Sequence, residues 1–163
     1  MNDLGPASSR YFGDGFKFRR QSIEDVHVDM DALTAAATVG LHTVQGARPT
    51  PEGIEGDYQP SVTMVDCFVV NLQLAQVLMY EMDGIRRSDS NTLWMLNTVL
   101  EAQHPHRSTA PPLRAHTNVT NKHLLTLRGD TWRNVDLAGT LAGVELRCSF
   151  AHQLPASAVP ITG

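Results

Sequence analysis

The segment that decides the fold runs from Pro60 to Asp83 and reads PSVTMVDCFVVNLQLAQVLMYEMD. It is the only long segment of strongly helical character, and stretches of strand character lie on both sides of it. Pro60 and Ser61 suit a helix start and cap, and Gly84 suits a helix end. The sequence therefore predicts one long helix over about residues 61–83.

The predicted helix has one polar stripe, and most of its remaining surface is apolar. At about 100° per residue, the stripe collects Thr63, Asp66, Gln73, Gln76, Tyr80 and Glu81. A helix that is apolar over so much of its surface is expected to be largely surrounded by other structure.

Two strands are predicted before the helix. Residues 23–30 alternate between apolar and polar side chains, which is typical of a strand. Residues 33–43 are rich in alanine, which favours a helix locally, but their strict alternation and their threonines favour a second strand. A loop rich in glycine and proline, residues 44–59, then leads into the helix.

The remaining strands are predicted after the helix. Residues 92–100 are apolar on both faces, which is typical of a central strand covered on both sides. Residues 114–128 look extended, the turn at Gly129 and Asp130 leads to residues 132–137 as a hairpin, and residues 143–152 alternate cleanly. The order predicts an α+β protein with a single hotdog fold, in which a curved antiparallel sheet wraps around one long central helix. The predicted domain spans residues 23–154, between an N-terminal arm (1–22) and a flexible tail (155–163).

Composition excludes several classes of protein. The 163 residues are 42% hydrophobic and 18% charged, as expected for one globular domain. A net charge of −4 and a pI near 5.9 argue against nucleic-acid binding. Polar residues interrupt every apolar run before it could span a membrane, so no membrane partner is expected. Without a signal pattern, and with Cys67 and Cys148 in apolar settings, a reduced cytoplasmic protein is predicted.

The start of the predicted helix resembles that of the hotdog dehydratases of fatty-acid synthesis. In that family a proline is followed six residues later by the catalytic Glu or Asp, and Pro60 and Asp66 have this spacing. The resemblance implies an acid/base role for Asp66. Two positions depart from it: Glu52 stands where long-chain dehydratases have a histidine, and Val70 stands where the family has a glutamine.

A second resemblance covers more of the chain. The YFGDGF sequence at 11–16, residues 21–39 and residues 60–75 together resemble the avirulence protein D family, which is similar to the hotdog proteins that make butyrolactone signalling precursors. The resemblance implies transfer or processing of a β-ketoacyl thioester, carried by coenzyme A or acyl carrier protein. Family members are longer and contain two such units. The resemblance therefore implies a half-length relative, a fragment, or a chain that completes its site by pairing.

Asp66 and His42 are the predicted catalytic residues. The positive end of the helix dipole favours the Asp66 carboxylate and its apolar neighbours favour the neutral acid, a balance that suits a general acid or base. The alternative is that Asp66 belongs to a solvent-facing polar stripe. His42 ends the second predicted strand, before the loop that feeds the helix, and its alternative is an ordinary surface histidine.

Pro60, Gln73 and Tyr80 are the predicted substrate-binding residues, and the alternative for the two helix residues is solvent or partner contact. No cofactor and no metal are expected. A homodimer is expected, because one isolated sheet leaves its edges uncovered. Three functions stay open: acyl transfer, dehydration or hydrolysis on the same scaffold, and a non-catalytic binding module. Glu52, in place of the histidine, favours the binding module.

Overall fold

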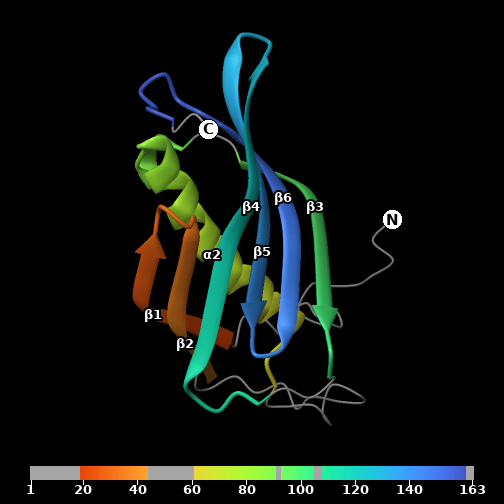
Figure 1. Ribbon diagram of the computed structural model, residues 1–163. Coiled ribbons are helices and arrows are strands. Elements are labelled where there is room, and N and C mark those ends of the chain that lie inside the picture. Colours follow the sequence, from red (N-terminus) through yellow and green to blue (C-terminus); the bar gives the residue numbers. More distant parts are fainter. Residues whose placement is uncertain (1–18, 44–60, 91–92, 105–107, 161–163) are drawn as a thin grey trace, which may run out of the picture.

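The computed structural model describes residues 19–43, 61–90, 93–104 and 108–160. Strands β1 (Arg19–Asp29) and β2 (Thr34–Thr43) precede helix α2 (Met64–Asp83) and the short 3-10 helix η3 (Arg87–Asp89). Strands β3 (Leu93–Ala102), β4 (Leu113–Leu127), β5 (Asp130–Leu141) and β6 (Val144–Gln153) follow. The described residues therefore form an α+β structure with one sheet and one α-helix (Figure 1).

The sheet has six strands in the order β1-β2-β4-β5-β6-β3, and every neighbouring pair is antiparallel. The β4–β5 hairpin turns at Arg128 and Gly129, whose φ angles are 54° and 90°. The β5–β6 hairpin turns at Ala142 and Gly143, with φ angles of 49° and 78°. Two consecutive positive φ angles are the geometry of the tight turn that matches strand twist. The hairpin predicted at Gly129 is confirmed.

Helix α2 lies across one face of the sheet and contacts all six strands (Figure 1). Alternation along β2 directs Ala35, Ala37 and Val39 into the core, each at most 2% exposed. The prediction of a strand rather than a helix for this alanine-rich stretch is confirmed. No helix of the described ranges is long and apolar enough to cross a membrane.

The predicted helix start is wrong by three residues. Helix α2 begins at Met64 and not at Ser61, because Thr63 caps it and Asp66 returns the contact as a capping box. The end is as predicted: Asp83 is the last helical residue, and Gly84 adopts the left-handed conformation with φ of 60°.

The prediction that β3 is a central, doubly covered strand is also wrong. Strand β3 lies at an edge of the sheet, and Trp94 and Leu96 are 54% and 56% exposed. An apolar sequence on both faces cannot distinguish a buried strand from an edge strand that exposes apolar side chains. Trp94 gains partial cover by packing against Trp132, with ring centroids 5.0 Å apart.

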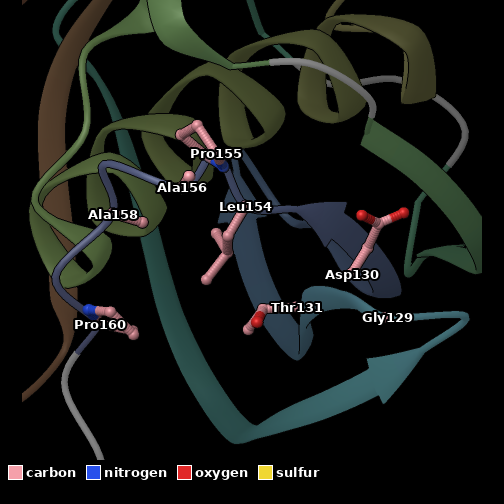
Figure 2. A pocket seen from close by; sticks show the side chains of 8 residues that line it. All are labelled: Gly129, Asp130, Thr131, Leu154, Pro155, Ala156, Ala158 and Pro160. Atoms are coloured by element: carbon pink, nitrogen blue, oxygen red, sulfur yellow. The ribbon is translucent and has the colours of Figure 1, made fainter.

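Both ends of the described chain contact the core structure. Residues 19–22 of the predicted arm begin β1, and residues 1–18 lie outside the described residues. Beyond β6, the Leu154 amide donates to the Thr131 carbonyl and the Val159 amide donates to the Asp83 carbonyl, both at 2.9 Å. Residues of the 154–160 segment and of the β4–β5 turn line an open pocket of about 270 Å³ (Figure 2). The segment thus crosses the C-terminal end of α2.

Asn71 sets how closely the helix approaches the sheet. Its side chain is fully buried, donates to the Cys67 carbonyl at 2.8 Å and accepts from the Thr117 hydroxyl at 2.6 Å. Gly139 of β5 faces it, and a Cβ at that position would collide with the Asn71 side chain. The close contact therefore requires a glycine at position 139, and the two hydrogen bonds of Asn71 depend on this close contact.

Gly139→Ala is expected to lower the free energy of unfolding by about 1–3 kcal/mol, because the added methyl group overpacks the contact with Asn71. Urea denaturation of the wild type and the variant measures this change. In an Asn71→Ala background the same substitution should cost much less, since the colliding amide is gone. An equal loss of stability in both backgrounds would contradict a collision between the added methyl group and the Asn71 side chain.

Candidate functional site

Asp66 lies buried in the first turn of α2, with 1% of its surface exposed. Its Oδ2 atom accepts from the Thr63 backbone amide at 2.9 Å and from the Thr63 hydroxyl at 2.8 Å. Its Oδ1 atom accepts from the Gln21 side-chain amide at 2.9 Å, across to strand β1. The alternative that Asp66 faces solvent with Gln73 is therefore wrong, because the Asp66 side chain is buried and bonded to β1 while Gln73 is exposed.

Within the described residues, Asp66 combines burial with hydrogen bonds from the neutral groups of Thr63 and Gln21. The Thr63 and Gln21 groups donate without carrying charge, and the helix N-terminus adds a partial positive charge. Such surroundings hold a carboxyl group in one orientation in a region from which water is largely excluded. Gln21 was not among the predicted site residues. The alternation of β1 places it on the inner face, but nothing in its residue type marks it for this role.

Among the described residues, the predicted site residues His42 and Tyr80 do not lie beside Asp66. His42 is exposed and pairs with the Ser22 hydroxyl at 3.1 Å on the outer face of the sheet. Asp66 lies on the inner face, so the sheet separates the two predicted catalytic residues. Tyr80 is half-buried near the other end of the helix, and Pro60 and Glu52 lie outside the described residues.

Cys67, next to Asp66, is fully buried. The pKa of its thiol is raised to about 11, mainly by burial; hydrogen bonds from Asn71 and at the Leu141 backbone act against this rise, and the charge of Asp66 adds to it slightly. The thiol is thus protonated at neutral pH and is no nucleophile. The prediction that both cysteines are free, buried core residues is confirmed.

A second polar cluster lies at the opposite end of α2. Asp83 and Arg133 are 0% and 1% exposed, and the guanidinium donates twice to Asp83 Oδ1, from Nε at 3.0 Å and from Nη2 at 2.7 Å. A carboxylate at a helix C-terminus opposes the macrodipole, and Arg133 offsets this cost. Asp83 Oδ2 is buried and has no hydrogen-bond partner among the described residues.

His152 of β6 completes this cluster, directly opposite Arg133 in the strand register. It is fully buried, its Nε2 lies 2.9 Å from the Ser90 hydroxyl, and its Nδ1 has no hydrogen-bond partner in the described part of the chain. The Tyr80 ring packs edge-on against the imidazole, at 6.1 Å between centroids. Sequence reasoning missed this cluster because its members come from separate elements. A charged residue at the inward position of Arg133, among alternating apolar ones, was the available signal.

Acid should destabilise the protein through His152. Burial lowers the pKa of His152 below its ordinary value of 6.5, although the charge of Asp83 acts to raise it. The unfolded chain therefore takes up a proton near pH 6.5 that the folded protein does not. The free energy of unfolding should fall as the pH drops below that value, by up to about 1.4 kcal/mol per pH unit until the folded pKa is reached.

The measurement is urea denaturation of the wild type and of His152→Gln between pH 7.5 and 5. Glutamine can still bond to Ser90 but does not titrate, so the stability advantage of the wild type should shrink in acid. If the difference in free energy of unfolding between the two proteins stays constant over this pH range, His152 is ruled out as the titrating group.

A comparison with known protein families finds a match for most of the chain. A family model described as Pseudomonas avirulence D protein (AvrD) matches residues 1–155. A search of curated proteins and a search of solved structures each found no match.

Within the described residues, no group of three or more His, Cys, Asp or Glu side chains could hold a metal ion.

Proposed function

The chain belongs to the avirulence protein D family, and from that premise we propose that it is a hotdog enzyme acting on an acyl thioester. The proposed substrate is a β-ketoacyl group carried by coenzyme A or acyl carrier protein, in the biosynthesis of a signalling molecule or other secondary metabolite. The family description supports a biosynthetic role connected with avirulence. A long helix packed on one face of an antiparallel sheet is consistent with the hotdog fold. The free, buried cysteines support a cytoplasmic location.

The observation that carries the proposal is the buried Asp66 carboxylate at the start of the helix. In the proposed role it takes a proton from the acyl chain or a reacting hydroxyl and returns it later. Gln21 and Thr63 hold its two oxygens in place and leave the proton transfer to the carboxylate. Gln73 and Tyr80 remain proposed contacts of the substrate along the helix, and Pro60 at its start. His42 remains a proposed catalytic partner of Asp66, but only if the protein adopts an arrangement other than the one described, because here the sheet separates the two residues.

A non-catalytic binding module is the second candidate, and one observation favours it. Asp66 forms the capping box of α2, which is by itself a sufficient structural reason for an acidic residue there. Dehydration of a hydroxyacyl thioester and hydrolysis of an acyl thioester remain alternatives within the enzyme class. Product analysis with hydroxyacyl and acyl-CoA substrates separates these two reactions from transfer.

Asp66→Asn should abolish turnover of β-ketoacyl thioesters while the protein stays folded. General acid–base catalysis contributes about 10²- to 10⁴-fold, so the rate should fall by that factor. The asparagine oxygen can keep the contacts with Thr63, and Gln21 can turn its amide to present oxygen to the new NH₂ group. Thioester consumption is followed by mass spectrometry, and the fold by circular dichroism and thermal unfolding.

Asp89→Asn is the matched control, because Asp89 is an exposed carboxylate in η3. It should turn over substrate at the wild-type rate. If Asp66→Asn is folded and equally active, the catalytic role fails. If neither protein turns over a β-ketoacyl, hydroxyacyl or acyl thioester yet the wild type binds one, the binding module is favoured.

We also propose that the protein forms a homodimer through β3. This edge strand exposes Trp94, Met95, Leu96 and Val99, at 54%, 46%, 56% and 38%. An exposed apolar edge strand is a template for pairing, and a two-fold axis would join it to the same strand of a second copy. The pairing would cover apolar surface that the monomer leaves in water.

Leu96→Lys should weaken the dimer at least about tenfold, a cost of about 1.4 kcal/mol, because it buries a charge at the proposed interface. Size-exclusion chromatography with light scattering over a dilution series measures the change. Leu125→Lys is the control, since Leu125 is 52% exposed in the β4–β5 hairpin, which projects beyond the rest of the sheet (Figure 1). A monomeric wild type, or equal dissociation of the two variants, would contradict this interface.

A further inference from the structure

Ser90 and His152 form a hydroxyl–imidazole pair just beyond the C-terminal end of α2. The Ser90 Oγ lies 2.9 Å from His152 Nε2, within hydrogen-bond distance. His152 is fully buried beneath, whereas Ser90 is half-buried. The hydroxyl therefore lies between solvent and a base that water does not reach, which is the arrangement of a nucleophile and its general base.

The surroundings of the imidazole favour one tautomer. Burial lowers the pKa of His152, so the ring is neutral and carries its proton on only one nitrogen. Asp83 Oδ2 and His152 Nδ1 are both buried and both lack a hydrogen-bond partner among the described residues. The negative charge of Asp83 acts on the imidazole, and a proton on Nδ1 complements that charge. Nε2 is then the acceptor that faces Ser90.

Three further contacts hold this arrangement. Arg133 fixes Asp83 through two hydrogen bonds to Oδ1, and Asp83 Oδ2 has no hydrogen-bond partner among the described residues. Tyr80 packs edge-on against the imidazole and limits its rotation. The Val159 amide, bonded to the Asp83 carbonyl, brings the C-terminal segment across the end of the helix. These groups come from α2, β5, β6 and the final segment, so only the fold brings them together.

We propose that Ser90 is a nucleophile, with His152 as its general base and Asp83 as the positioning residue, in a second reactive site that accepts acyl groups from esters or thioesters. The site is separate from Asp66, which lies in the first turn of the same helix, so it does not rest on the function proposed above. The arrangement has the order of roles found in serine hydrolases: hydroxyl, imidazole, carboxylate.

The reaction needs no oxidant, reductant or cofactor. Ser90 Oγ attacks the acyl carbonyl carbon, its proton moves to His152 Nε2, and the carbon–sulfur or carbon–oxygen bond breaks. The leaving thiolate or alkoxide takes the proton from His152, which leaves an acyl ester on Ser90. Water then attacks this ester and gives a proton to His152. The carbon–Oγ bond breaks, Oγ regains the proton, and a free acid departs.

The test is covalent labelling of the full chain with a fluorophosphonate, followed by peptide mass spectrometry. Ser90 should be labelled at least tenfold faster than Ser88, which is exposed nearby and donates to Asp89 instead of facing an imidazole. Ser88→Ala should leave the labelling of Ser90 unchanged. His152→Gln should remove it, and Asp83→Asn should slow it. Asp66→Asn should leave it intact, which separates this site from the proposed Asp66 chemistry.

Because His152→Gln or Asp83→Asn can also unfold the protein, the wild type supplies a second measurement. Labelling of Ser90 should fall in acid along a single titration with a midpoint below the ordinary histidine pKa of 6.5, and Asp83, Arg133 and Tyr80 are the titratable groups that face the ring. Labelling of Ser90 that is no faster than that of Ser88, or that shows no such titration, would overturn the proposal.

Discussion

The structure depends on the burial of helix α2 against the inner face of the sheet. Small residues at the contact allow the two to approach: Ala35 and Ala37 on β2, and Gly139 on β5 opposite Asn71. Close approach makes Asn71 costly to bury, because its amide must find partners away from water. The bonds to Thr117 and to the Cys67 carbonyl provide them. The same contact fixes the rotation of the helix about its axis.

That rotation decides which acidic side chains of the helix are buried. Asp66 and Asp83 lie at opposite ends of α2, and both are almost fully buried. The first gains from the helix dipole and from neutral donors, whereas the second opposes the dipole and requires Arg133. One helix therefore supports two polar clusters of different character. We propose the first as a proton-transfer site and the second as a nucleophile with its base.

Much of the fold follows from the sequence because alternation and turn chemistry are local properties. The strand character of residues 33–43 and the glycine turn at Gly129 could be predicted for this reason. The position of β3 could not, because neighbours in a sheet are set by contacts between distant segments. Of the residues that meet around Asp66, the sequence singled out Asp66 but not Gln21. Gln21 is joined to it by a hydrogen bond that spans 45 residues of sequence, and no local pattern reports such a contact.

The amino-acid sequence was enough to identify the class of the protein: one long apolar helix, six strands, and membership of one family over residues 1–155. Tertiary structure alone decided which polar groups meet. It separated His42 from Asp66, since alternate side chains of a strand point to opposite faces. It joined Asp83, Arg133, His152 and Ser90, since antiparallel pairing places the start of β5 beside the end of β6, against the last turn of the helix. Periodicity shows on which face of a helix or strand a residue lies, but only the packing of the elements shows which residues it contacts.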